Sequence, residues 1–305
     1  MAPVPAIGVF LPTMSERGEA LADVVAAARQ AEELGFESVW AVDQLVAGTG
    51  VPFVDSTVAL SAAAGATRNI KLAYGVMILP LRPVVWAAKQ VASLQQVSGG
   101  RVLFGVGVGG DRHERSWEAA GVPRRERGRR TDAALEVLPD LIAGKAAAVD
   151  GTTVQLAPGA TVPPIVVGGM AEAALARTVT YGDEWFSLPL PPDQVAGSAA
   201  RLAELAAERG RPAPGITGSV NVALDGDPTL PDRDGLIRRL SDPDGAYGMP
   251  AEAVPDILVA GGAGAVAERI AAWRDLGAGR VVVTLTAGSW PRQAELLAEA
   301  VAQLG

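Results

Sequence analysis

Short apolar runs alternate with segments of helical periodicity along almost the whole chain, and this alternation limits the folds open to it. Buried parallel strands are typically such runs, and here they fall at residues 6–11, 38–42, 70–79, 101–105, 165–167, 184–187, 216–224 and 280–286. Helical patterns follow nearly all of them, at 19–34, 83–97, 124–143, 171–181, 192–209, 264–276 and 291–304. The alternation of strand and helix indicates a parallel sheet with crossover helices.

Eight such units without an intervening linker predict one domain, residues 1–305, folded as an α/β (β/α)8 TIM barrel. An open doubly wound sheet has the same alternation and is the alternative; the strand count favours the barrel. Two insertions are expected. A hairpin at 146–156, turning at Asp150-Gly151, follows the fourth strand, and an irregular Pro/Gly/Asp-rich segment, 225–250, follows the seventh and is a candidate lid over a substrate.

The composition excludes several kinds of site and partner. The chain has no cysteine and one histidine, His113, so disulfides, thiolate sites and multi-histidine metal sites are excluded. A net charge of −8 disfavours nucleic acid as a partner. Residues 1–12 carry no basic side chain, unlike the start of a signal peptide, and the most apolar stretch, 76–81, is far shorter than the roughly 20 residues of a membrane helix. We expect a cytoplasmic protein without a metal or a membrane partner.

Two polar residues, Asp43 and Gln44, follow the second predicted strand. Active sites of barrels are built from the residues just after the strand C-termini. An acid and an amide at this place can hydrogen-bond the polar edge of a ring or a substrate. They can also satisfy backbone donors of the strand-end loop, and the two residues alone favour that interpretation.

Glycines mark two further strand ends. Gly75 interrupts the third apolar run, as in a bulge, a close approach of a ligand or a packing site. The loop 105–110 formally contains G-x-G-x-x-G, but no apolar helix begins directly after it and its unit is fourth in the series. A loop that admits a planar ring or an anion is therefore preferred to a dinucleotide fingerprint. His113 follows it as a candidate acid–base group, although a lone loop histidine is more often solvated.

A third glycine site, Gly168-Gly169-Met170, joins a strand to a helix. The free N–H groups and the dipole of a helix N-terminus favour an anion, and glycines let the backbone approach it. No Lys-Ser/Thr pair follows, so the motif is not a Walker loop. We predict a cradle for a phosphate group.

Taken together, these motifs resemble the luciferase-like monooxygenase family over nearly the whole chain. The strings that carry the likeness are AEELGFESVWAVDQL (31–45), GVMILPLRPVVWAAKQVASLQQVSGGRVLFGVGVGG (75–110), ERGRRTDAALEVL (126–138) and PPIVVGGMAEAALARTVTYGDEWF (163–186). The resemblance implies a (β/α)8 barrel that uses reduced FMN or the deazaflavin coenzyme F420, and the chain looks most like the F420-dependent branch. A homodimer is a further implication, as is a partner reductase that supplies the reduced cofactor.

The resemblance also implies roles for single residues. Asp43 and Gln44 occupy the position that lies against the cofactor ring. The Gly75–Val76 bond matches a non-proline cis peptide that supports one face of the ring. Val108 and Gly109 match the loop beside the ring, and Gly168, Gly169 and Met170 match the phosphate cradle.

Two departures from the family pattern bear on the activity. Sugar-phosphate dehydrogenases of the family have a histidine in place of Gln44 and a glutamate near Gly110, and an amide cannot shuttle a proton near neutral pH. That activity is therefore doubtful here. The remaining candidate proton donors are Asp43, His113, Glu114, Tyr74 and solvent.

Three functional hypotheses follow. The leading one is F420-dependent hydride transfer to or from a small organic substrate. An FMN-dependent two-component monooxygenase is the second, and a flavin-binding protein without turnover is the third.

Overall fold

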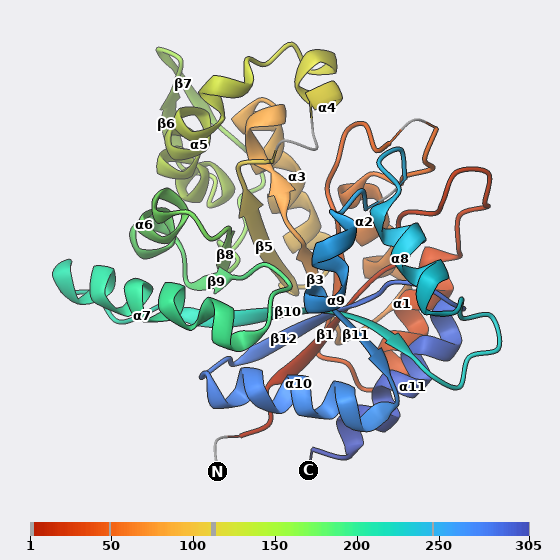
Figure 1. Ribbon diagram of the computed structural model, residues 1–305. Helices are drawn as coiled ribbons and strands as arrows, with labels where there is room; N and C mark the ends of the chain where they lie inside the picture. Colours follow the sequence, from red (N-terminus) through yellow and green to blue (C-terminus); the bar gives the residue numbers. More distant parts are fainter. Residues whose placement is uncertain (1–2, 49, 111–113, 246, 305) are drawn as a thin grey trace.

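Eight parallel strands close into a barrel in the computed structural model, which describes residues 3–48, 50–110, 114–245 and 247–304 (Figure 1). The barrel strands are β1 (Ala6–Phe10), β2 (Ser38–Ala41), β3 (Lys71–Tyr74), β5 (Val102–Gly107), β8 (Ile165–Gly168), β9 (Glu184–Phe186), β10 (Gly215–Leu224) and β12 (Arg280–Leu285). Each pairs with the next in space, and β12 returns to pair with both β10 and β1. An open sheet would leave two unpaired edges, so this closure confirms the predicted barrel.

A main helix follows each barrel strand and packs outside it (Figure 1). These helices are α1 (Val24–Glu33), α2 (Ser56–Ala66), α3 (Val84–Val97), α5 (Arg127–Ile142), α6 (Glu172–Tyr181), α7 (Pro192–Glu208), α10 (Ala263–Asp275) and α11 (Trp290–Ala302). No helix of the described residues is long and apolar enough to cross a membrane.

Additional elements lie in three of the connections. Between β5 and β8 the chain forms α4 (Glu114–Ala119), the 3₁₀ turn η3 (Arg124–Glu126) and a hairpin of β6 (Ala146–Val149) and β7 (Thr152–Gln155). Between β10 and α10 it forms α8 (Arg233–Ser241), η4 (Ala251–Ala253), α9 (Val254–Ile257) and β11 (Leu258–Gly261), which pairs with β10. Short β4 (Met77–Ile78) and η1 (Leu79–Leu81) follow β3.

The structure corrects the sequence predictions at four places. No helix was predicted at α2, and residues 225–250 were expected to be irregular although α8 lies within them. The first helix was predicted from residue 19 but begins at Val24, where the Asp23 carboxylate accepts from the N–H groups of Val25 and Ala26. The third strand was predicted as continuous, and it is divided at a cis peptide bond between Gly75 and Val76 into β3 and β4.

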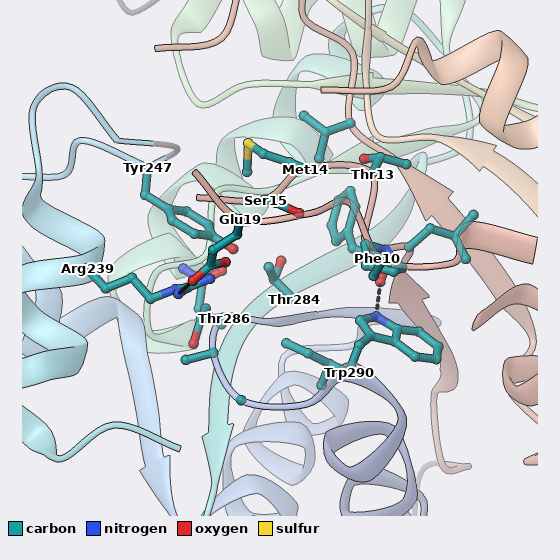
Figure 2. Close-up of a pocket in the computed structure, with 18 of the residues that line it drawn as sticks. Phe10, Thr13, Met14, Ser15, Glu19, Arg239, Tyr247, Thr284, Thr286 and Trp290 are labelled. Atoms are coloured by element: carbon teal, nitrogen blue, oxygen red, sulfur yellow. Dashed lines mark hydrogen bonds and ion pairs between the residues drawn. The ribbon is translucent and has the colours of Figure 1, made fainter. Parts of the chain in front are cut away.

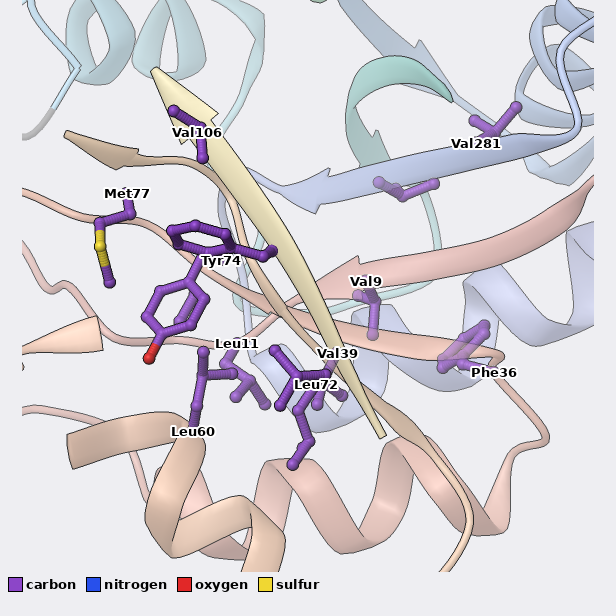
Figure 3. Close-up of a cluster of buried hydrophobic side chains, with 14 of the residues drawn as sticks. Val9, Leu11, Phe36, Val39, Leu60, Leu72, Tyr74, Met77, Val106 and Val281 are labelled. Atoms are coloured by element: carbon purple, nitrogen blue, oxygen red, sulfur yellow. The ribbon is translucent and has the colours of Figure 1, made fainter. Parts of the chain in front are cut away.

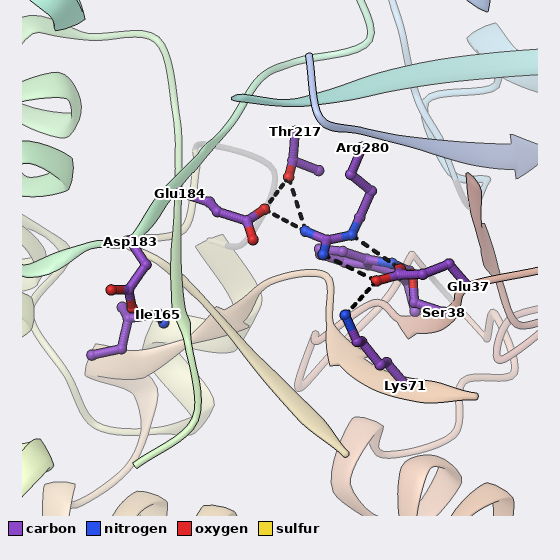
Figure 4. A network of polar contacts seen from close by, with 9 residues as sticks. Glu37, Ser38, Lys71, Ile165, Asp183, Glu184, Thr217 and Arg280 are labelled. Carbon is purple, nitrogen blue, oxygen red and sulfur yellow. Dashed lines mark hydrogen bonds and ion pairs between the residues drawn. The ribbon is translucent and has the colours of Figure 1, made fainter. Parts of the chain in front are cut away.

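The barrel interior is layered. At the N-terminal end of the strands, Arg280 on β12 binds the carboxylates of Glu37 and Glu184, and Glu37 also pairs with Lys71 at 2.7 Å (Figure 4). Two acidic side chains therefore neutralise one buried guanidinium. Burial by itself raises the pKa of Glu37, but hydrogen bonding and the charge of Arg280 bring it below its ordinary value.

An apolar layer fills the middle of the barrel. Every barrel strand except β10 contributes one side chain to it: Phe10, Trp40, Ala73, Leu103, Val166, Phe186 and Val282. The rings of Trp40 and Phe186 stack with centroids 5.1 Å apart. β10 places the polar Ser219 opposite Val282 at this level. This layer closes the barrel from below, so any ligand site within it lies at the C-terminal end of the strands.

A larger core lies between the barrel and its helices (Figure 3). Tyr74 belongs to this outer core, with its ring edge-on to Phe104 and its hydroxyl 3.2 Å from that of Thr57 on α2. Burial raises the pKa of the Tyr74 hydroxyl far above its ordinary value. Tyr74 therefore faces away from the barrel interior and stays protonated.

Candidate active site at the barrel mouth

Two adjoining cavities open at the C-terminal end of the strands. The glycine pocket, about 440 Å³, is bounded by backbone around Gly75, Gly107–Gly110 and Gly168–Gly169. The outer pocket, about 430 Å³, extends beneath the loop 11–22 and the α8 insertion (Figure 2). Phe10, Val42, Asn221 and Thr284 line both cavities, so the two share one wall.

One glycine of this wall, Gly107, makes room for the side chain of Val76. A Cβ atom on Gly107 would lie 2.5 Å from Val76 Cγ2, whereas one on Gly168 would lie at an ordinary contact distance of 3.4 Å from the same side chain. The Val76 side chain is thus packed against neighbouring strands, where Gly107 makes room for it. The cis bond from Gly75 was predicted from the resemblance, and the structure confirms its geometry.

The predicted cradle lies at the far end of this pocket. Gly168 and Gly169 line it, and Gly169 has a φ of +125°, which disfavours any side chain. Ala171 precedes α6 and supplies no side-chain cap, so the N-terminus of this helix keeps unsatisfied donors for a ligand. Met170, predicted with the two glycines, instead packs its side chain against the outer core.

Val108 and Gly109 also line the glycine pocket, as the resemblance implies. Gly109 has a φ of +72°, and a Cβ there would lie 2.8 Å from Trp117 on α4. Trp117 is 3% exposed and closes this side of the pocket from behind. The loop backbone is therefore held between a buried indole and the cavity.

Asp43 lies at the edge of the glycine pocket, but its carboxylate is fully occupied by protein donors. Arg82 donates to both oxygens at 2.9 Å, Ser56 donates to Oδ1 at 2.9 Å, and the backbone N–H of Ile78 donates to Oδ2 at 2.7 Å. Burial by itself lowers the pKa of Arg82, yet the adjacent Asp43 charge raises it overall. Four donors leave this carboxylate no free lone pair, so the geometry favours positioning over the predicted catalytic role.

Gln44 lines the outer pocket, and its Nε2 donates to the carbonyl of Val46 at 3.1 Å. His113, the other predicted acid–base residue, lies outside the described residues. Tyr74 and Glu114 line neither pocket. The described candidates thus include no free acid directed at the shared wall.

The outer pocket has both apolar and polar residues at the shared wall and charged residues at its rim. Trp290 Nε1 donates to the carbonyl of Phe10 at 2.9 Å, which fixes the indole against the end of β1 (Figure 2). At the rim, Arg239 on α8 lies 3.5 Å from Glu16 and 3.6 Å from Glu19. Tyr247 lines the same rim. The segment predicted as a lid therefore does border this pocket, and ion pairs connect it to the first loop.

Sequence reasoning missed the polar part of the wall of the glycine pocket. Ser219 and Asn221 are alternate residues of β10, and Thr284 is paired in register with Asn221 from β12. All three line the glycine pocket. The available signal was the period of two in Thr217, Ser219 and Asn221, which places small polar side chains on one face of an otherwise apolar strand.

The luciferase-like monooxygenase family model matches residues 6–230, about three quarters of the chain. The chain belongs to this family. It is 34% identical over 171 residues to uncharacterized proteins of Mycobacterium bovis and Mycobacterium tuberculosis, a match that covers 54% of this chain and 58% of those proteins. The aligned region thus spans little more than half of the curated relatives.

Solved structures share the fold across the whole chain. An F420-dependent secondary alcohol dehydrogenase in complex with an F420-acetone adduct has a TM-score of 0.82 at 17% identity, covering 99% of each chain. The coenzyme F420-dependent tetrahydromethanopterin reductase of Methanopyrus kandleri has a TM-score of 0.75 at 17% identity, also covering 99% of each. The EDTA monooxygenase of Chelativorans sp. BNC1 has a TM-score of 0.75 at 15% identity, covering 99% of this chain and 94% of its own. At these identities the likeness establishes the fold.

Proposed function

We propose that this family member is an oxidoreductase that uses coenzyme F420 for hydride transfer to or from a small organic substrate. The observation that carries the proposal is the pair of adjoining pockets with a common wall: one is a glycine-lined slot that ends at an uncapped helix N-terminus, and the other is a cavity lined by both apolar and polar side chains. A planar cofactor with an anionic tail fits the first, and a substrate in the second lies against it.

The residues present fit such a cofactor. The backbone at Gly75–Val76 and at Val108–Gly109 supports a flat ring, and Gly168 and Gly169 leave room for a phosphate at α6. A reduced flavin or deazaflavin ring supplies the hydride when bound. The protein supplies position, and Phe10 and Trp290 form part of the apolar lining of the outer pocket.

Reduction of a carbonyl, an imine or an activated alkene also requires a proton. Asp43 is fully bonded and Tyr74 lies behind the barrel wall. We therefore assign the proton to solvent or to His113, and we do not expect Tyr74 to set the pH dependence of turnover.

An FMN-dependent two-component monooxygenase is the second candidate, because EDTA monooxygenase shares the fold. Purified protein titrated with F420 and with FMN, followed by fluorescence, separates the two. Preferential F420 binding is expected, and selective FMN binding would overturn the cofactor assignment and favour the monooxygenase, with a reductase as its partner.

A single-turnover assay distinguishes an enzyme from a protein that binds the cofactor without turnover. Reduced cofactor bound to the protein is mixed with a broad panel of unsaturated compounds, and its oxidation is followed by absorbance. Acceleration by at least one compound is expected. If none accelerates oxidation beyond the rate without compound, the binding-protein hypothesis replaces the enzyme.

We also propose a homodimer through the face of α2 and α3. Trp86 on α3 is 63% exposed and Val58 on the adjacent α2 is 62% exposed, which is unusual for large apolar side chains on neighbouring helices. Sedimentation of the wild type and of Trp86→Glu tests this. A dimer that the substitution dissociates is expected, and a wild-type monomer would contradict it.

A further inference from the structure

Asn221 is a buried amide with an unmet donor at the junction of the two pockets. The residue is 4% exposed, and its Nδ2 has no hydrogen-bond partner. Strand pairing holds Asn221 in place, because β10 pairs with β12 on one side, and the last residues of β10, from Asn221 on, also pair with β11. The side chain lines both the glycine pocket and the outer pocket.

An unmet buried donor is costly unless a ligand satisfies it. Leaving one unpaired costs about 1–3 kcal/mol, and an apolar side chain of similar size would avoid that cost. The neighbours on this wall are Ser219 and Thr284, which are also polar. The wall thus groups three hydrogen-bonding side chains in a slot whose other lining residues, apart from Asp43 and Ser187, are glycine or apolar.

The arrangement of polar groups in the glycine pocket identifies the kind of ligand. At one end lie the carboxamide and the two hydroxyls, and elsewhere in the same lining lie Gly168 and Gly169 before α6. A matching ligand has a flat apolar body with a polar edge and an anionic tail. Flavin and deazaflavin rings share such an edge, a pyrimidinedione whose two carbonyls flank one N–H. A carboxamide, with one acceptor and two donor hydrogens, complements it.

We propose that Asn221 hydrogen-bonds the pyrimidinedione edge of the cofactor ring, donating from Nδ2 to a ring carbonyl, and that this contact sets the depth of the ring in the glycine pocket. The inference rests on the proposed function, because it requires a flavin-type ring in this slot. It assigns Asn221 to the part of the ring that FMN and F420 have in common. Asn221 therefore contributes to affinity for both cofactors and does not select between them.

The test compares Asn221→Leu with the wild type and with Thr286→Val. Thr286 is a matched control, because it is 1% exposed, lies at the same mouth and lines only the outer pocket. Fluorescence titration with F420 and with FMN gives the dissociation constant for each protein. We expect Asn221→Leu to weaken binding of both cofactors about tenfold, by a similar factor for each, and Thr286→Val to leave both unchanged.

Two further measurements separate a ring contact from a structural role. Without cofactor, Asn221→Leu should melt at or above the wild-type temperature, because it removes an unmet donor; a structural role would lower the melting temperature. A donor to a ring carbonyl stabilises the negative charge of the reduced ring, so the substitution should lower the reduction potential of bound FMN. If Asn221→Leu does not fold, Asn221→Asp, which keeps the size and loses the donor, replaces it.

The outcomes distinguish this inference from the proposed function. If the wild type binds neither F420 nor FMN, both fail. If the wild type binds a cofactor and Asn221→Leu binds it equally tightly, the ring-edge contact is wrong while the proposed function stands. Weaker binding with a lowered melting temperature would also overturn the contact, because it indicates a fold defect.

Discussion

Asp43→Asn should destabilise the protein strongly in the absence of any cofactor, because the Asp43 carboxylate holds together three segments of the barrel mouth. It binds Arg82 after η1, Ser56 at the start of α2 and the backbone N–H of Ile78 on β4. The Asp43 side chain is 2% exposed and that of Arg82 is 19% exposed. The pair is therefore screened little by solvent.

The structure sets the size of the effect. Removing one partner of a buried ion pair costs about 3–5 kcal/mol, because the other charge is left uncompensated. Asparagine keeps one oxygen that can still accept from Ile78 or Ser56, so we expect a loss near the lower limit, about 3 kcal/mol. That is a large part of the roughly 5–15 kcal/mol that stabilises a typical domain.

Urea unfolding of the cofactor-free protein, followed by circular dichroism and tryptophan fluorescence, measures the change. Arg82→Met should cost a similar amount, and the double variant should cost clearly less than the sum, since it leaves no unpaired charge. Asp140→Asn is the control, because its pair with Lys145 is largely exposed, and it should change stability little. A loss below about 1 kcal/mol for Asp43→Asn, or strict additivity with Arg82→Met, would refute the positioning role.

Three further substitutions test other parts of the structure. Arg280→Met should cost about 3 kcal/mol at pH 7. Arg280 keeps the folded pKa of Glu37 below its ordinary 4.5, so the stability from Glu37 is present above that value and lost as the pH falls through the lowered pKa. The difference in the free energy of unfolding between variant and wild type, measured in urea, should therefore shrink at pH 3.5. A difference that stays constant with pH would count against the pairing. Gly218→Ala would place a Cβ 2.5 Å from Cδ2 of the buried Trp273 and should lower the free energy of unfolding by about 1–3 kcal/mol in the same assay. An unchanged urea midpoint would be evidence against tight packing between Gly218 and Trp273. Gly169→Asp adds a negative side chain to the cradle at a φ of +125° and should abolish cofactor binding in a fluorescence titration, so an unchanged affinity would eliminate the cradle.

The barrel could be predicted from the sequence because its strands are short apolar runs bounded by clear helical patterns. The same approach failed at α2, whose sequence STVALSAAAGA is rich in small residues and has little contrast between faces. Its helix depends on tertiary packing and on the Asp55 cap, which accepts from the N–H of Val58. α8 was missed for a related reason, since Pro, Gly and Asp around it indicate loop structure while Leu236 and Leu240 bury one face.

The glycine half of the candidate site could be predicted because several glycines recur at the ends of predicted strands, which a barrel brings together at one mouth. Gly75, Gly109, Gly168 and Gly169 all line the same pocket. The polar half could not be found in this way. Asn221 lies within the predicted strand 216–224, whose period of two groups it with Thr217 and Ser219 on one face, but only closure of the barrel shows that this face is directed into the cavity.

Asp43 shows how a correctly located residue can have a different role. The resemblance places it against the ring, and it does line the glycine pocket. Yet its oxygens accept hydrogen bonds from Arg82, Ser56 and Ile78. Ile78 lies two residues after Val76, whose cis peptide bond with Gly75 forms part of the pocket wall. These contacts hold the carboxylate in a buried ion pair. The proposed ring contact is therefore assigned to a neutral group, Asn221, whose Nδ2 is a buried donor without a partner among the described residues.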